Sequence, residues 1–172
     1  MNVELSQARR DGVLQAMKRY SSMVYRLAYA RTRNHADAED IYQEVFLKLA
    51  RADIPFENQE RVKAWLLRVT VNCSVNLFRS AWRRHVQTVE ALPERASPSI
   101  DDERYEALDR ALDVLPARYR AVIHLYYYED MSVDEISAVL DAKPATIRSR
   151  LSRGRERLRR ELTQSKEANP NA

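Results

Sequence analysis

The sequence predicts an all-α protein of two small helical domains joined by a flexible linker. Only two of its 172 residues are glycine, and the alternating Val, Ile and Thr runs that are typical of strands do not occur. Apolar residues instead recur every three or four positions, which is the spacing of a helix with one buried face. That spacing lapses over residues 86–103, where prolines, serines and acidic residues gather. We therefore expect domains over residues 1–85 and 104–163, a linker over 86–103, and a disordered tail over 164–172.

The composition favours a binding protein with a polyanionic partner, because the net charge is +4 and the pI is about 9.3. The single cysteine, Cys73, excludes an internal disulfide and a cysteine-based zinc site. The three histidines are far apart and lack metal-ligand spacing. We expect no metal, no cofactor and no enzymatic activity. The first residues do not resemble a signal peptide, and no apolar run reaches membrane length, so we expect a cytoplasmic protein without membrane insertion.

The first helix is expected from about residue 5 to residue 32. Its apolar side chains follow helical spacing and form one buried stripe, made by Val13, Met17, Tyr20, Val24 and Leu27. We assign this helix to core packing and expect no site on it.

The next helix, over residues 34–51, has two different faces. Asn34 suits its N-cap, and the buried line contains Ile41, Val45 and Leu49. The opposite line is acidic with an apolar edge, and it contains Asp40, Gln43, Glu44 and Leu47. Such a face suits the docking of a basic partner helix. A solvated face without a partner is the plain alternative.

A long helix is expected from Gln59 to His85, with a core stripe of Val62, Leu66, Val69, Cys73 and Leu77. A neighbouring face mixes cations, amides and one aromatic ring, and it contains Trp65, Arg68, Asn72, Asn76, Arg79 and Arg83. Such a face can bind single-stranded nucleic acid, because arginine meets phosphates, aromatic rings stack on bases and amides read base edges. The alternative is that Trp65, Phe78 and Trp82 are ordinary core residues.

The second domain is expected to contain four helices. Helical spacing resumes with Tyr105, Leu108, Leu112 and Leu115, and Pro116 starts another helix. We expect the three consecutive tyrosines over residues 126–128 in the core and at its rim.

Residues 131–162 then have the pattern of a helix-turn-helix. Ser132 and Glu135 have capping-box spacing, with Met131 and Ile136 placed as the hydrophobic staple. Pro144 suits the first position of the second helix, where a missing N–H costs nothing.

The second helix of this motif is strongly basic. Its apolar stripe contains Ile147, Leu151, Leu158 and Leu162. Residues 141–162 include eight cationic and three acidic side chains, so this segment carries more net positive charge than the whole chain. We expect this helix to meet DNA phosphates. A solvated arginine-rich helix is the alternative.

These segments together resemble a bacterial RNA polymerase sigma factor of the compact extracytoplasmic-function (ECF) type. The similar stretches are DAEDIYQEVFLKL (37–49), WLLRVTVNCSVNLFRSAWRR (65–84), LPARYRAVIHLYYYEDMSVDEISAVL (115–140) and TIRSRLSRGRERL (146–158). The resemblance implies a helical protein that binds core polymerase, recognises the minus-ten and minus-thirty-five promoter elements, and promotes melting without covalent chemistry of its own.

The resemblance also implies roles for particular residues. The clamp helices of the polymerase β′ subunit would contact Asp40, Gln43, Glu44, Phe46 and Leu47. The minus-ten non-template strand would contact Trp65, Arg68, Asn72, Asn76, Arg79 and Arg83. The major groove at the minus-thirty-five element would receive Lys143, Thr146, Arg148, Ser149, Ser152 and Arg153. Further implied partners are the β flap of the polymerase and an anti-sigma factor.

Two alternatives belong to other classes of protein. The first is a dimeric helix-turn-helix repressor that binds palindromic duplex DNA without polymerase. The second is a metal-dependent enzyme built on His35, Asp37, Glu39, Asp40 and Glu44.

Overall fold

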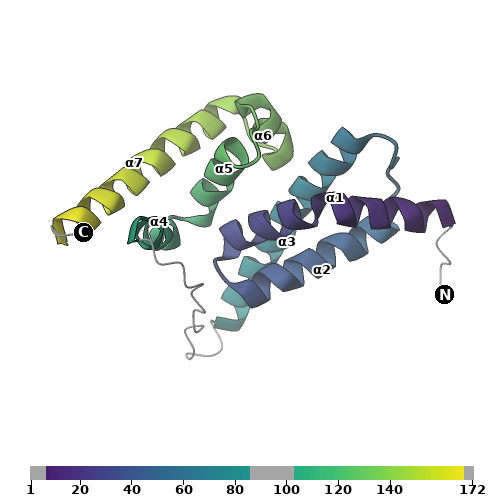
Figure 1. The fold of residues 1–172 in the computed structure, drawn as a ribbon, viewed down its shortest axis with the longest axis horizontal. Helices are drawn as coiled ribbons and strands as arrows, with labels where there is room; N and C mark the ends of the chain where they lie inside the picture. Colours follow the sequence, from purple (N-terminus) through teal and green to yellow (C-terminus); the bar gives the residue numbers. More distant parts are fainter. Residues whose placement is uncertain (1–6, 86–102, 169–172) are drawn as a thin grey trace. The chain divides into compact units, whose positions relative to one another are not determined.

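The computed structural model describes residues 7–85 and 103–168, with side chains described for residues 7–82 and 107–164. Within these ranges the chain forms seven helices and no strand. It divides into two compact units, Met1–Ala91 and Leu92–Ala172 (Figure 1). The prediction of an all-α protein with two helical domains is confirmed. Apart from residue 103, the expected linker lies outside the described residues.

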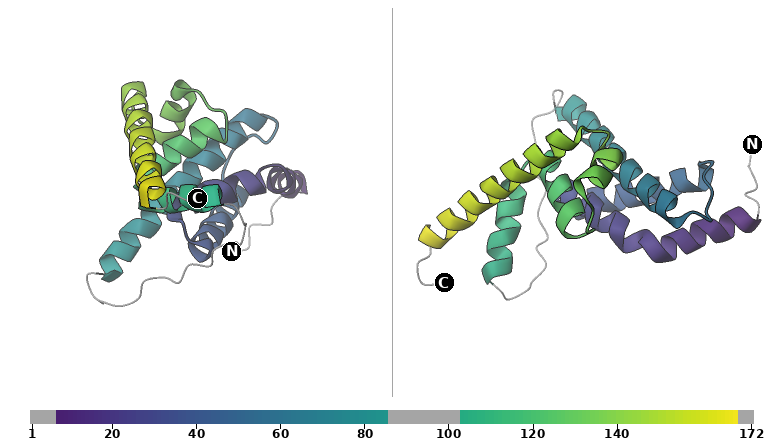
Figure 2. Two further views of the ribbon diagram at one scale, coloured as in Figure 1. Left: turned by 60° about the vertical axis from the view of Figure 1, so that its left-hand side comes forward. Right: turned by 90° about the horizontal axis from the view of Figure 1, so that it is seen from above.

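The first unit contains α1 (Gln7–Thr32), α2 (His35–Arg51) and α3 (Gln59–His85), and each of these helices packs against the other two (Figures 1 and 2). All three contribute side chains that are at most 1% exposed, among them Val24, Leu27, Ile41, Val45, Leu49, Val62, Leu66 and Leu67. The α2 boundary follows the predicted cap, because the Asn34 side chain accepts a hydrogen bond from the Asp37 N–H at 2.9 Å.

Gly12 determines how closely α1 approaches the loop between α2 and α3. A Cβ atom at this position would lie 2.6 Å from Cγ of the Phe56 ring. The Phe56 carbonyl accepts a hydrogen bond from Gln59 Nε2 at 2.8 Å, and the Gln59 carbonyl accepts one from the Tyr20 hydroxyl at 3.1 Å. These contacts tie the loop to α1 and fix where α3 begins.

The second unit contains α4 (Glu103–Val114), α5 (Ala117–Tyr127), α6 (Val133–Leu140) and α7 (Pro144–Ala168), and α7 packs against the other three. Its most deeply buried side chains, each at most 3% exposed, include Leu115, Val122, Leu125, Ile136, Ile147 and Leu151. Gly154 lies where α5 meets α7, since a Cβ atom there would be 2.8 Å from Cδ1 of Ile123.

The last helix is longer than the sequence pattern indicates. The apolar stripe ends at Leu162, but α7 continues to Ala168, which includes five residues of the expected tail. Apolar spacing reports only on side chains that pack, whereas residues such as Gln, Lys and Glu can extend an exposed helix through their intrinsic propensity. None of the described helices is both long and apolar enough to cross a membrane.

Candidate functional site

The outer face of α2 presents the acidic line predicted from the sequence. Asp40, Gln43 and Glu44 are exposed, and Leu47 is 58% exposed. Phe46 differs from the others, because it is 6% exposed and its ring centre lies 4.9 Å from that of Tyr42. Phe46 therefore supports this face from the core and offers little surface of its own.

One lysine connects the acidic line to the neighbouring helix. Glu44 Oε1 lies 2.8 Å from Lys48 Nζ, and the same Nζ lies 3.6 Å from Sγ of Cys73 on α3. The hydrogen bond to Glu44 raises the pKa of Lys48. An exposed ion pair of this kind contributes only about 0–1 kcal/mol, so Glu44 can exchange Lys48 for a partner's cation at little cost.

An exposed polar row runs along α3. It contains Arg68, Asn72, Asn76 and Arg79, with the half-buried Trp65 near its start. The predicted Arg83 lies on the same helix, but its side chain is outside the described residues. From Arg61 to Arg84, both included, the sequence holds six lysine or arginine residues and no acidic one. This face therefore suits a polyanionic strand whose bases can reach the amides.

An apolar row lies beside the polar row on α3. Val75 and Phe78 are half-buried, Trp82 is 73% exposed, and with Arg79 they line a shallow pocket. The alternative that Trp82 is an ordinary core residue is therefore wrong. Helical spacing places Trp82 in line with Val75 and Phe78. Spacing alone does not show that the end of α3, where Trp82 lies, extends beyond the packed core.

The first helix of the helix-turn-helix has the predicted capping box. Ser132 Oγ accepts from the Glu135 N–H at 3.2 Å, and a Glu135 carboxylate oxygen accepts from the Ser132 N–H at 2.7 Å. The predicted staple residues Met131 and Ile136 are both buried.

The turn forms without glycine. Asp141 occupies the left-handed region with φ 48°, where a short polar side chain is better tolerated than most. The Ala142 N–H then donates to the Ser137 carbonyl at 3.1 Å, and α7 begins at Pro144, as predicted.

The first turns of α7 separate a buried face from a polar one. Ile147 and Leu151 are buried. The polar face holds the residues predicted to read duplex DNA: Lys143, Arg148, Ser152 and Arg153 are exposed, and Thr146 and Ser149 are partly so. A helix that presents cations and hydroxyls near its N-terminus has the form of a recognition helix for the major groove.

Two arginines that the sequence prediction did not single out flank the buried Tyr119. The guanidinium carbons of Arg118 and Arg157 lie 4.8 and 5.2 Å from the Tyr119 ring centre. The hydrogen bond from Arg118 lowers the pKa of Tyr119. These two arginines are far apart in the sequence and come together only because α5 packs against α7. The only signal in the sequence is the large number of cationic residues in this domain.

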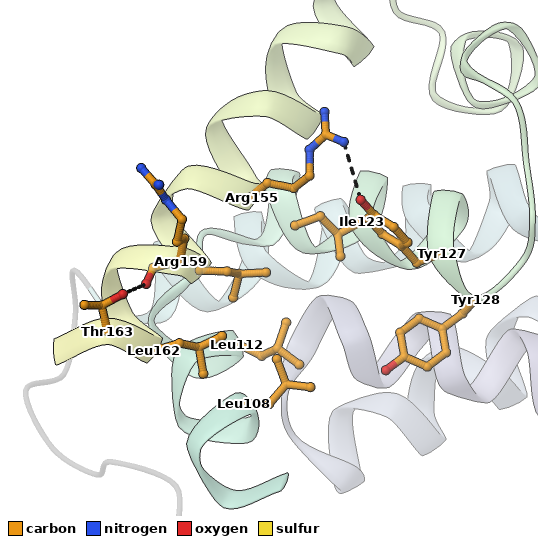
Figure 3. Close-up of a pocket in the computed structure, with 10 residues that line it drawn as sticks. Leu108, Leu112, Ile123, Tyr127, Tyr128, Arg155, Arg159, Leu162 and Thr163 are labelled. Carbon is orange, nitrogen blue, oxygen red and sulfur yellow. Dashed lines mark hydrogen bonds between the residues drawn. The ribbon is translucent and has the colours of Figure 1, made fainter. Parts of the chain in front are cut away.

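An apolar groove lies between α4, α5 and α7 (Figure 3). Its floor is lined by Leu108, Leu112, Ile123, Leu158 and Leu162. Tyr127, Tyr128, Arg155 and Arg159 lie around it, and the Tyr127 hydroxyl is 3.4 Å from a guanidinium nitrogen of Arg155. The groove therefore offers an apolar surface with a basic rim.

The geometry gives no support to the metal-dependent alternative. His35 Nδ1 lies 2.8 Å from the Tyr25 hydroxyl, and its ring stacks on Tyr29. Over the described ranges, no group of three or more His, Cys, Asp or Glu residues is placed to hold a metal ion.

Comparison with known proteins decides the family. Residues 16–84 match the model of Sigma-70 region 2, and residues 105–158 match that of Sigma-70, region 4. The RNA polymerase sigma factor SigV of Bacillus subtilis is 30% identical over 139 residues, which cover 81% of this chain and 84% of SigV. The ECF sigma-E factor of Escherichia coli is 31% identical over 135 residues, which cover 70% of this chain and 71% of that protein.

The chain belongs to the ECF sigma factors.

The ECF sigma factor SigE of Mycolicibacterium smegmatis is a further relative, with 38% identity over 154 residues. That match covers 83% of this sigma factor but only 58% of SigE. Members of this non-catalytic family act in transcription initiation through regions 2 and 4, so this chain is a transcription initiation factor and not an enzyme.

Two solved structures share the fold. The sigma factor RpoE of Bartonella quintana, in complex with the anti-sigma factor NepR, has a TM-score of 0.67 and 24% identity, and the match covers 87% of this chain and 95% of RpoE. CnrH, in complex with the cytosolic domain of CnrY, has a TM-score of 0.59 and 22% identity, with 92% and 99% covered.

Proposed function

We propose that this sigma factor directs core RNA polymerase to promoters and helps to open them through surfaces on α2, α3 and α7. The observation that carries the proposal is the position of the predicted binding residues. Apart from Phe46, those whose side chains are described lie on exposed or partly exposed faces of the two sigma-70 regions. We also propose that a linker over residues 86–103 separates the two domains, while the second domain extends past its expected bound at residue 163 because α7 continues to Ala168.

The α2 face binds the β′ clamp helices of the polymerase. Asp40, Gln43 and Glu44 supply an acidic surface for a basic helix, and the exposed Leu47 supplies an apolar contact at its edge. The weak Glu44–Lys48 ion pair supports this assignment, because its exchange for an intermolecular pair costs little.

The polar row of α3 binds the non-template strand of the minus-ten element. Arg68 and Arg79 meet phosphates, while Asn72 and Asn76 read base edges and Trp65 offers part of a ring for stacking. Contacts to unpaired bases stabilise the separated strands, and this binding energy drives melting.

The N-terminal part of α7 enters the major groove at the minus-thirty-five element. Arg148 and Arg153 are suited to guanine edges, with Ser149 and Ser152 between them for further polar contacts. Lys143 and Thr146 lie at the start of the helix, where a DNA phosphate also meets the positive end of the helix dipole.

Two protein partners and a location complete the proposal. The apolar groove of the second unit suits an apolar helix of the polymerase β flap. An anti-sigma factor that covers these surfaces would hold the protein inactive, and the sigma factor RpoE, which has a similar fold, was solved with the anti-sigma factor NepR. We place the protein in the cytoplasm, where the polymerase works.

Run-off transcription on a promoter library tests the proposal. The purified chain is added to sigma-free core polymerase of its host, and we expect initiation at defined sites that core polymerase alone does not select. A normally folded protein that confers no start-site selection would overturn the proposal. Tight binding to a palindrome without polymerase, measured by gel shift, would favour the dimeric repressor instead.

A further inference from the structure

Among the described side chains of the first unit, Trp82 is the most exposed large apolar one, and the fold does not account for it. It is 73% exposed in the last described turns of α3. A helix turns about 100° per residue, so Trp82 shares a line with Val75 and Phe78, about a quarter turn from the row of Arg68, Asn72 and Asn76. An apolar aromatic surface therefore borders the polar row directly.

Phe78, which lines the pocket together with Trp82, is in contact with a buried arginine. The guanidinium carbon of the buried Arg31 lies 5.8 Å from the Phe78 ring centre. Arg31 is itself held by a hydrogen bond of 2.9 Å from its Nε to Ser74 Oγ. The contact with Arg31 therefore supports the Phe78 ring, which lines the pocket with Trp82.

The charge around the pocket indicates what covers it. Arg79 belongs both to the pocket lining and to the polar row. The sequence continues with Arg83 and Arg84, and there is no acid between Arg61 and His85. An apolar protein segment would gain nothing from this density of cations, whereas a nucleic acid strand offers phosphates for the arginines and a base for the ring.

We propose that Trp82, supported by Phe78 and Val75, stacks on an unpaired base of the promoter DNA beside the polar row of α3. This inference rests on the proposed function and adds a residue that the sequence prediction did not assign to DNA binding. Every base has a π-face, so stacking by Trp82 holds the strand open with little dependence on base identity.

The test measures binding of single-stranded DNA to the holoenzyme formed with core polymerase. The probe is a labelled non-template-strand oligonucleotide from a promoter that wild type opens in the run-off assay. We expect Trp82→Ala to weaken binding about 5- to 150-fold, the range for loss of one base–aromatic stack. Trp82→Phe should retain most of the affinity, because it keeps an aromatic face.

Leu14→Ala is the matched control, since Leu14 is another exposed apolar side chain of the first unit at 55% exposure. It should leave the affinity for the oligonucleotide unchanged. An abasic site is then moved along the oligonucleotide one position at a time. At the stacked position, wild type and Trp82→Ala should bind equally well, because the base that distinguishes them is gone.

The outcomes separate this inference from the proposed function. If wild-type holoenzyme binds the probe and Trp82→Ala binds equally well, the inference fails and the proposed function stands. If Trp82→Ala instead weakens assembly with core polymerase, Trp82 faces the polymerase and the inference is wrong. If wild-type holoenzyme does not bind the probe, both fail.

Discussion

The two glycines lie at close contacts between segments, and the two contacts differ in how easily they can relax. At Gly12 a new Cβ would meet the rigid ring of Phe56, with Cγ at 2.6 Å and Cδ2 at 2.7 Å. At Gly154 it would meet the end of a flexible side chain, Cδ1 of Ile123, at 2.8 Å. The same substitution should therefore have different effects at the two sites.

We expect Gly12→Ala to destabilise the first unit by about 1–3 kcal/mol, the usual cost of overpacking. In Gly154→Ala the gain in helix propensity, about 1 kcal/mol, should largely offset a small rotation of Ile123. Urea unfolding of both variants measures this difference. Equal losses of stability would contradict it, and adding Phe56→Leu to Gly12→Ala should restore part of the loss.

Cys73 provides a second test at the level of one residue. It is 1% exposed, and burial raises the pKa of its thiol. We expect the folded protein to react slowly with a thiol reagent at pH 8 and the unfolded protein to react rapidly. In the native state the reagent cannot reach the buried Cys73 sulfur, and less of the thiol is ionised to the reactive thiolate. Rapid reaction of the native protein would show that this part of α3 opens easily.

The same thiol makes stability depend on pH in a defined direction. With a folded pKa above the ordinary value of about 8.5, the native state keeps its proton where the unfolded state loses it. Stability of the first unit should therefore fall as pH rises above that value. The variant Cys73→Ala, compared with wild type over the same pH range, should lack this component.

Among the helices, α2 has the proposed binding face that charge-reversal substitutions can test most directly. Reversal at Asp40 and Glu44 to lysine should weaken binding to core polymerase strongly, because like charges would then face the basic partner helix. The isolated protein should keep its helical content, since both side chains are exposed. Pull-down with core polymerase measures the effect. Unchanged affinity would show that this face does not bind the polymerase.

The recognition helix α7 can be tested by substitution on its polar face. Arg148→Ala and Arg153→Ala should each cost about 1–3 kcal/mol of discrimination between the correct base and others at one position. Arg160→Ala is the control on the same helix, where Arg160 is paired with Glu156 at 2.9 Å. Binding to promoter variants measures the discrimination. An equal loss on every sequence would indicate a phosphate contact instead.

The elements show which parts of the structure the sequence could predict. The caps at Asn34 and Ser132 are local, and the predicted boundaries of α2 and α6 follow from them. Exposure of the α2 face also followed from helical spacing. The burial of Phe46 and the contacts of Arg118 and Arg157 with the Tyr119 ring depend on how helices pack, and spacing along one helix contains no information about that.

Unfolding of the whole molecule can be followed with two spectroscopic signals, because both tryptophans lie in the first unit. Trp65 and Trp82 report on region 2, whereas far-ultraviolet circular dichroism reports on the helices of both units. Each unit has its own buried core, so we expect the two signals to give urea transitions that do not coincide. Coincident transitions would show that the two units unfold together.

A single substitution makes this test more specific. Ser132→Ala removes the cap of α6 and should destabilise the second unit by about 1 kcal/mol. The dichroism transition should then shift to lower urea concentration while the tryptophan transition stays in place. A shift of both signals would mean that the second unit supports the first.

Three bends of the described backbone have positive φ without using glycine: Arg33 at 54°, Asp130 at 51° and Asp141 at 48°. A residue with a side chain strains the folded backbone there, but it also leaves the denatured chain with less freedom than glycine would. Substitution of one of these residues by glycine would relieve the strain in the folded state but would make the denatured chain more flexible. The three positions can therefore be screened for a more stable variant of the protein for crystallisation. Asp130→Gly is the first such substitution to measure, because Asp130 lies outside the three binding surfaces.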